Sequence, residues 1–293
     1  MTPIHSNPLE YRSPLEGVDS PESLTETLRK TFQATGSDIV LGEKLLAYSS
    51  RLFRGELASH QPNTLNYHDY QHTLQAAYCF LDLVYGQSQN SANSLGPREV
   101  ELGFAAILLH DSGYLKVSGD NDGSGAKYTY SHVLRSCALA ATLLPSFGCQ
   151  VEEIDLVVGA IRCTGLNGNP GAINFSSANA RTIGCMIATA DYLGQMGAPQ
   201  YPEKLPYLFA EFTEADDFTN VPQAKRSFPS VEAMLSATPG FWLHFVRPKL
   251  DADFASVHRF LSPTGKAEDN PYLKAVELNI AVIVRHSSAN AKA

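Results

Sequence analysis

Apolar residues recur along this chain with the spacing of helices, and the strict alternation of a half-buried strand is scarce. Ser20-Pro21 places a proline in a favoured first-turn position, and Gly36 is expected to end this first helix. Pro97 begins another helix, whose apolar stretch leads directly into His110-Asp111. Further helices are expected over 38–58, 68–85 (ended by Gly86), 131–144, 152–163, 177–196, 203–215, 230–235, 241–261 and 271–285.

The breaks between these segments are rich in Gly, Asn and Pro, notably at 119–125 and 165–171. None of them combines length with the shift in composition that marks a domain boundary, and there is no internal repeat. The pattern predicts an all-α fold with one compact helical domain over 21–287. A flexible N-terminal segment, 1–20, and a flexible tail, 288–293, are expected on either side.

Composition narrows the class of protein. The chain has 293 residues, of which 44% are hydrophobic and 18% charged, as in an ordinary globular protein. With 22 basic and 30 acidic side chains the net charge is −8, which disfavours a general nucleic-acid binder. An anionic small substrate stays compatible with this charge, because a bound metal ion can invert the local sign.

The sequence also bears on the compartment. No apolar run approaches the roughly 20 residues of a membrane span. Segment 1–20 has neither the basic start nor the apolar middle of a signal peptide. The five cysteines are odd in number and form no CxxC pair, as expected of buried, reduced thiols. A cytoplasmic protein with no membrane partner is therefore expected.

Three local features carry candidate chemistry. His68 and His72 are four residues apart, so both rings would point to one side of a helix. His110-Asp111 places an imidazole and a carboxylate at the end of an apolar run. Asp191 is an isolated acid on a helix of small and apolar residues, where burial without a partner would cost several kcal/mol.

Together, His72, His110, Asp111 and Asp191 form a set of two nitrogen and two oxygen ligands. Such a set suits zinc, manganese or iron better than calcium. Each part alone has an ordinary alternative: a surface histidine pair, a common dipeptide, a helix cap. Their order, each on an apolar helical segment, favours a metal site. The dinucleotide-binding, P-loop and nucleophile-elbow motifs are absent from the sequence.

The order of these residues resembles the metal-dependent phosphohydrolases of the HD superfamily, and more distantly the class I cyclic-nucleotide phosphodiesterases. The resemblance covers 67–248. It rests on His68-Asp69-Tyr70-Gln71-His72, which matches His-Asn-x-x-His with Asp for Asn, on Arg162-Cys163-Thr164-Gly165, on Thr189-Ala190-Asp191 and on Gly240-Phe241-Trp242-Leu243-His244-Phe245-Val246-Arg247-Pro248. Two departures bear on the substrate. Ser112-Gly113-Tyr114 lacks the extra histidine that follows the doublet in those enzymes, and Thr238 stands near the place of their purine-reading glutamine.

The resemblance implies a phosphodiesterase-like helical HD domain and roles for individual residues. The four-residue set would hold the first of one or two divalent ions (Zn, Mn, Mg or Fe), and Asp111 would bridge to the second. A hydroxide activated by the metal would attack phosphorus. His68 would protonate the leaving alkoxide, and Asp69 would orient a neighbouring imidazole.

Four further residues are candidates with ordinary alternatives. His132, which begins a helix after the glycine-rich loop, would be a ligand of a second metal, or a histidine exposed to water. Arg135 and Lys116 would contact a phosphate, or extend into solvent as surface side chains. Phe241 would stack on a flat group of the substrate, or belong to the core.

The leading hypothesis is hydrolysis of a phosphomonoester or phosphodiester in a small, nucleotide-like molecule. One alternative is a di-iron HD oxygenase. Such proteins generally use more histidines between the doublet and the last aspartate, where this chain has only His132. The other alternative is a non-catalytic, metal-dependent nucleotide sensor. The natural substrate, the metals and the oligomeric state stay open at this stage.

Overall fold

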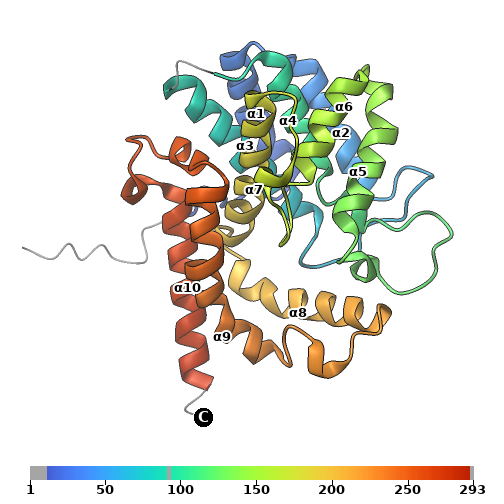
Figure 1. The fold of residues 1–293 in the computed structure, drawn as a ribbon, viewed down its shortest axis with the longest axis vertical. Coiled ribbons are helices and arrows are strands. Elements are labelled where there is room, and N and C mark those ends of the chain that lie inside the picture. The colour runs from blue at the N-terminus through green and yellow to red at the C-terminus, as the bar shows by residue number, and fades with distance from the viewer. Residues whose placement is uncertain (1–11, 91–93, 291–293) are drawn as a thin grey trace, which may run out of the picture.

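A computed structural model describes residues 12–90 and 94–290. Over these residues the chain forms ten α-helices and no β-sheet, apart from a single bridge between His60 and Val117 (Figure 1). This confirms the all-α prediction. The helices are α1 (Pro21–Thr35), α2 (Ile39–Phe53), α3 (Tyr70–Asn90), α4 (Pro97–Leu109), α5 (His132–Leu143), α6 (Val151–Ile161), α7 (Ala178–Met196), α8 (Tyr201–Phe218), α9 (Val231–Phe241) and α10 (Pro271–Asn290).

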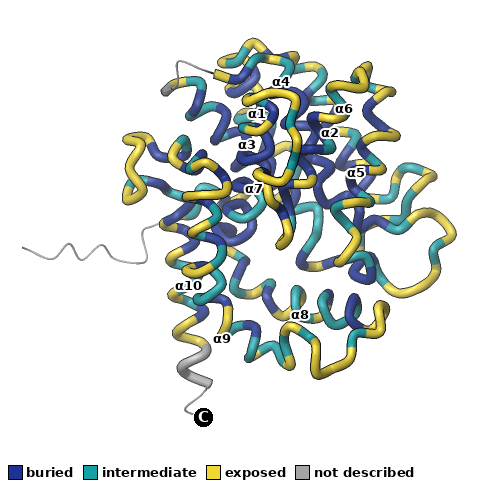
Figure 2. Tube along the Cα trace, viewed as in Figure 1, coloured by how far each residue is buried: buried dark blue, intermediate teal, exposed yellow. Residues whose placement is uncertain are grey.

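The hydrophobic core is centred on α3 and α7, which pack along one another. Buried side chains from α1, α4 and α6 surround this pair, and Figure 2 shows the buried stretches gathered where these helices meet. Leu28, Phe80, Phe104 and Ile187 are fully buried members of one continuous cluster. This cluster fixes the relative positions of α3, α4 and α7, which carry the candidate ligands.

A second layer of helices lies beside this core. In Figure 1, α8 and α9 run beneath the main body, and α10 passes along its side. Only five of the 18 residues of α8 are buried, and two of these, Glu211 and Asp216, have carboxylate side chains. Polar contacts therefore contribute much of the attachment of α8 to the rest of the molecule.

Two helix boundaries near the candidate site differ from the prediction. The second helix ends at Phe53 rather than near 58, and Gly55 then adopts a left-handed φ of 68°. The helix expected over 68–85 begins only at Tyr70 and continues through Gly86 to Asn90. Gly86 does not end the helix; a Cβ there would lie 1.9 Å from the carbonyl oxygen of Phe260, so its small size permits close packing.

The segment expected to form one helix over 241–261 is irregular. Residues 242–246 and 249–253 form π-helical turns, and 257–261 form a 3₁₀ turn. Pro248 lies between the two π-helical segments and has no N–H to donate, so a regular α-helical hydrogen bond is lost there. The helix expected over 230–235 instead extends to Phe241.

The terminal segments lie partly outside the described residues. Within 12–20, Leu15 and Val18 are buried in the core, and the Ser13 hydroxyl donates to the carbonyl of Gly197 at 2.7 Å. Residues 1–11 and 291–293 are outside the described part of the chain.

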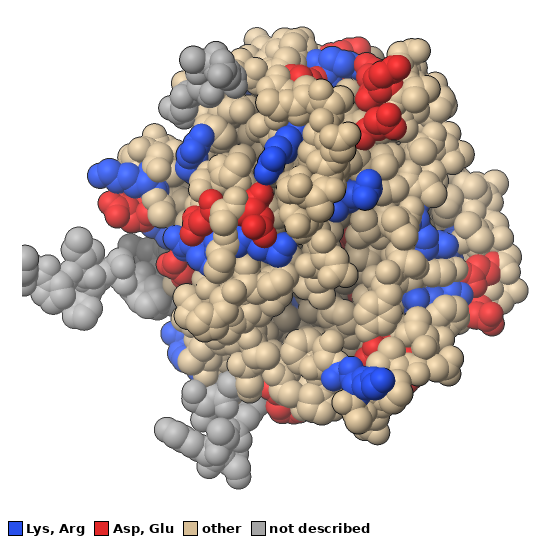
Figure 3. Space-filling model, viewed as in Figure 1, with Lys and Arg blue, Asp and Glu red and all other residues tan. Residues whose placement is uncertain are grey.

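The surface and helix lengths add two observations. In the part of the chain that the structure describes, no helix is both long and apolar enough to cross a membrane. On the face shown in Figure 3, basic and acidic side chains lie in small separate groups, with no continuous basic surface.

Candidate functional site

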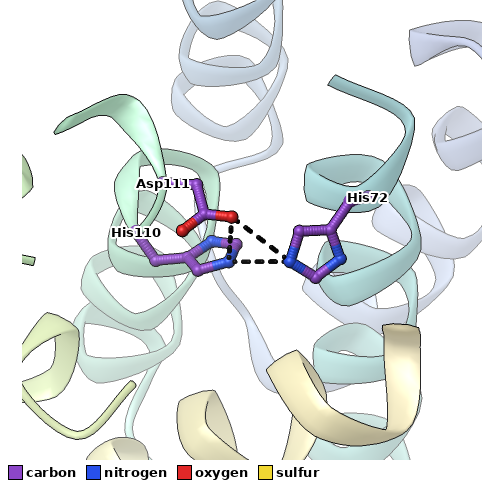
Figure 4. A group of neighbouring side chains, drawn as sticks. All are labelled: His72, His110 and Asp111. Carbon is purple, nitrogen blue, oxygen red and sulfur yellow. Dashed lines mark hydrogen bonds and ion pairs between the residues drawn. The ribbon is translucent and has the colours of Figure 1, made fainter. Parts of the chain in front are cut away.

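The four side chains predicted as metal ligands come together in the structure. His72 lies on α3, His110 and Asp111 directly follow α4, and Asp191 lies on α7. The Nε2 atoms of His72 and His110 are 3.3 Å apart, and each lies 3.3 Å from Asp111 Oδ2 (Figure 4). Asp191 Oδ1 is 3.2 Å from His72 Nε2 and 3.6 Å from His110 Nε2. Two imidazole nitrogens and two carboxylate oxygens therefore face one point.

Burial and hydrogen bonding direct these atoms inward. The side chains of His72 and His110 are 2% and 0% exposed, whereas that of Asp191 is 18% exposed and opens the cluster towards solvent. His110 Nδ1 donates to the carbonyl of Ile107 at 2.7 Å, which leaves Nε2 pointing into the cluster. Asp111 Oδ2 is fully buried and accepts no hydrogen bond from the described residues. A buried oxygen without a donor, beside two imidazole nitrogens, fits a divalent cation.

The cluster has strong internal electrostatics. Burial disfavours the protonated forms of His72 and His110, but the carboxylates of Asp111 and Asp191 outweigh this effect and raise the pKa of both histidines. Burial likewise disfavours the ionised forms of the two aspartates, yet the facing histidines lower the pKa of both. The two acids are therefore ionised and suited to a cation.

His68 lies in the turn before α3 rather than on the helix, so the prediction that it shares a helical face with His72 is wrong. Its ring centroid is nevertheless 6.2 Å from that of His72. His68 Nδ1 donates to Glu211 Oε2 on α8 at 2.6 Å, and the other oxygen of Glu211 accepts from the backbone N–H of Tyr67 at 2.9 Å. His68 Nε2 is left beside the hydroxyl of Tyr114, at 3.4 Å.

His132 also reaches the cluster. Its Nε2 is 3.7 Å from Asp111 Oδ1, the oxygen other than the one that faces His72 and His110. Its Nδ1 donates to the carbonyl of Thr129 at 2.7 Å, and its ring stacks against Tyr114 at 4.4 Å. Burial lowers the pKa of His132, although the charge of Asp111 opposes the shift. The neutral ring is thus favoured, as a metal ligand requires.

The turn after His110-Asp111 is held by α5. A Cβ on Gly113 would lie 1.9 Å from the carbonyl oxygen of His132, so only glycine allows this approach. The N–H of Gly113 donates to Ser136 Oγ at 2.8 Å. Arg135 donates to the carbonyls of Gly113 and Leu115 at 2.7 and 2.8 Å. Arg135, which the sequence suggested as a phosphate contact, therefore stabilises the backbone of this turn.

The two other candidate substrate contacts have different surroundings. Lys116 Nζ donates to the carbonyl of Gly123 at 2.7 Å, on an exposed loop. Phe241 is half-buried, stacks on Phe245 at 5.1 Å and lies 6.4 Å from the ring of Tyr192, the residue after Asp191. Within this aromatic group, only Tyr192 is adjacent in sequence to a candidate ligand, Asp191.

Asp69 acts differently from the expectation. Its Oδ1 accepts from the backbone N–H of His72 at 2.8 Å, which caps the start of α3, and its Oδ2 accepts from Lys204 Nζ at 2.5 Å. Among the described residues, its hydrogen bonds and ion pair involve no imidazole. The sequence did not predict that Lys204 and Glu211 belong to this site. No motif surrounds either residue, and their partners lie more than 130 positions away.

Comparisons with known proteins identify the fold. Neither a family model nor a curated protein matches the sequence. The structure is similar to that of the phosphodiesterase domain of the RhoPDE fusion protein from the choanoflagellate Salpingoeca rosetta, with 16% sequence identity and a TM-score of 0.61. The match covers 96% of this chain and 98% of that chain. The chain therefore has a phosphodiesterase-domain fold.

Proposed function

We propose that this chain is a metal-dependent phosphohydrolase that cleaves a phosphomonoester or phosphodiester of a small, nucleotide-like molecule. The observation that carries the proposal is the convergence of His72, His110, Asp111 and Asp191. The Nε2 atoms of the two histidines lie 3.3 Å apart, and each lies 3.2–3.6 Å from a carboxylate oxygen of both aspartates. The similarity to a phosphodiesterase domain over nearly the whole chain supports it. Membership of the HD superfamily and a cytoplasmic location are proposed with it.

The residues fit one divalent ion and offer part of a second site. His72, His110, Asp111 Oδ2 and Asp191 would hold the first ion. Asp111 Oδ1 and His132, 3.7 Å apart, would contribute to the second. Bound divalent ions would lower the pKa of water and neutralise phosphate charge. Manganese, zinc, magnesium and iron all accept this mixture of nitrogen and oxygen ligands.

His68 is the proton donor in this proposal. The Glu211 carboxylate occupies Nδ1, so Nε2 is the atom available to protonate the leaving oxygen. Glu211 also binds the neighbouring backbone N–H, which fixes the orientation of the ring. Phosphoryl transfer requires mainly positioning and charge neutralisation, so this small group of residues is sufficient.

The aromatic group supports a substrate with a flat part. Phe241 stacks on Phe245 and lies 6.4 Å from the ring of Tyr192, which follows Asp191 in the chain. Thr238 is buried, and its hydroxyl donates to the carbonyl of Met234 at 2.9 Å, so it offers no donor to a base. We therefore propose stacking rather than hydrogen-bonded base recognition.

The test is hydrolysis of aryl phosphomonoesters and phosphodiesters with added manganese. Wild-type turnover is expected, with a loss of roughly 100-fold or more in His110→Ala and in Asp111→Ala. His286→Ala, an exposed histidine near the end of α10, is the matched control and is expected to keep wild-type activity. Metal-dependent turnover that survives both cluster substitutions would rule out the proposed centre. Two irons per chain with oxygen consumption would instead indicate a di-iron oxygenase. Nucleotide binding without turnover would indicate a non-catalytic sensor.

A further inference from the structure

Helix α8 contacts two separate segments, 67–69 and the loop at Ser124, through charged side chains. Lys204 binds Asp69 beside the start of α3, and Glu211 binds His68 and the N–H of Tyr67. Further along, Glu214 accepts from the N–H and hydroxyl of Ser124 at 2.5 and 2.7 Å, in the loop that follows the His-Asp turn. Lys204 and Glu211 are seven residues apart, so they lie on the same side of the helix.

The ion pair between Lys204 and Asp69 is mostly shielded from water. The side chains are 12% and 26% exposed, and Lys204 Nζ lies 2.5 Å from Asp69 Oδ2. The second oxygen of Asp69 is already committed to the N–H of His72. One carboxylate thus joins α8 to the beginning of α3. A charge-assisted bond with both partners largely desolvated is stronger than an ordinary surface ion pair.

We propose that Lys204 is a positioning residue for the proton donor, His68. By holding Asp69, it fixes α8 against 67–72 and thereby keeps Glu211 on His68 Nδ1. The inference rests on the proposed function and deepens it, since it assigns a role to a residue that touches neither metal nor substrate. It also accounts for a largely shielded lysine side chain on a helix with few buried apolar side chains.

The substitutions separate charge from shape. Lys204→Met keeps most of the alkyl chain and removes the charge, whereas Lys204→Arg keeps the charge. Asp69→Asn keeps an oxygen to cap α3 but removes the negative partner. In Arg226→Met, the matched control, the ion pair with Asp217 near the other end of α8 is broken.

The assay compares an alkyl phosphoester with a p-nitrophenyl ester in the presence of manganese. For the alkyl ester, kcat is expected to fall by about 10-fold to 100-fold in Lys204→Met and in Asp69→Asn, with little change in KM. The p-nitrophenyl ester needs less help from a proton donor and should be affected much less. The double variant should be no worse than either single variant, because the two residues act as one pair. Lys204→Arg should recover much of the activity.

Hydrogen exchange supplies a readout that does not depend on turnover. Faster exchange is expected in Lys204→Met at 63–72 and 201–218 but not across the core helices, which separates a local release of α8 from general unfolding. Wild-type kcat for the alkyl ester in Lys204→Met overturns the inference while leaving the proposed function intact. So does an additive loss in the double variant. An inactive wild-type protein overturns both.

Discussion

At the scale of single residues, the cluster predicts how metal affinity depends on pH. A metal ion binds the neutral forms of His72 and His110, but the facing carboxylates raise the pKa of both rings. Protons therefore compete with the metal at higher pH than they would for an ordinary histidine. Affinity for manganese should therefore still be rising above pH 6.5, the ordinary pKa of histidine, with protons released on binding. Calorimetric titration in two buffers of different ionisation enthalpy measures both quantities; an affinity that does not change with pH contradicts this assignment.

His68 supplies a second prediction, which concerns the leaving group. In His68→Ala the cluster keeps all four candidate ligands but loses the proposed proton donor, so manganese affinity should stay near the wild-type value. Hydrolysis of an alkyl phosphoester should slow by roughly 100-fold to 10,000-fold. A p-nitrophenyl ester, whose leaving group needs no proton, should lose far less. Equal losses for both esters would assign His68 to another role.

Individual residues also show what the sequence can and cannot reveal. The candidate ligands follow one another in a characteristic order, each on an apolar helical segment, so their proximity could be predicted before any coordinates. Asp69 carried a usable signal as well, because aspartate is a favoured helix cap and would have placed the start of the helix at Tyr70. Glu211 and Lys204 had no such signal. Their partners lie 143 and 135 positions away, and only the packed structure brings them together.

At the scale of elements, the turn between α4 and α5 depends on Gly113. In Gly113→Ala the new Cβ would lie 1.9 Å from the carbonyl oxygen of His132 and 2.8 Å from the N–H nitrogen of Ser136, so α5 must move away from the His-Asp turn. A loss of about 1–3 kcal/mol in the free energy of unfolding is expected, with weaker metal binding.

Urea denaturation measures this loss, and Gly240→Ala is the matched control. A Cβ on Gly240, in α9, would have its nearest neighbour at 4.0 Å, so that substitution should be neutral or mildly stabilising. If the two alanine variants are equally stable, the close approach of α5 to the turn is not what Gly113 provides.

Some helix boundaries could not be predicted because the same residue type behaves differently in different packing environments. Gly36 and Gly86 have the same local appearance as helix ends, but only Gly36 adopts a left-handed φ, of 74°. Gly86 stays helical, and its lack of a side chain instead allows the carbonyl of Phe260, from a distant segment, to approach it closely. The irregular turns of 242–253 depend similarly on their neighbours, because the apolar spacing there is that of an ordinary helix.

At the scale of the whole molecule, apolar spacing predicted the fold class because α1, α4, α6 and α10 each pack against α3 or α7. The position of α8 could not be predicted from apolar spacing. Its attachment depends on Lys204, Glu211 and Glu214, whose polar contacts leave no periodic signature. The sequence could therefore predict the core and the candidate ligands it carries, but not the position of the helix that supports the proposed proton donor.

The same architecture predicts that a metal ion stabilises the entire fold. Helices α3, α4 and α7 meet at the cluster, so an ion held by His72, His110, Asp111 and Asp191 links three core helices. At 100 times its dissociation constant, a ligand specific for the folded state adds about 2.7 kcal/mol. For a chain of this size that corresponds to a rise in Tm of roughly 5 °C or more. Differential scanning fluorimetry with manganese and then excess EDTA should show the rise and its reversal. Asp191→Asn should lose most of the rise; the same rise in that variant would mean that the ion binds elsewhere.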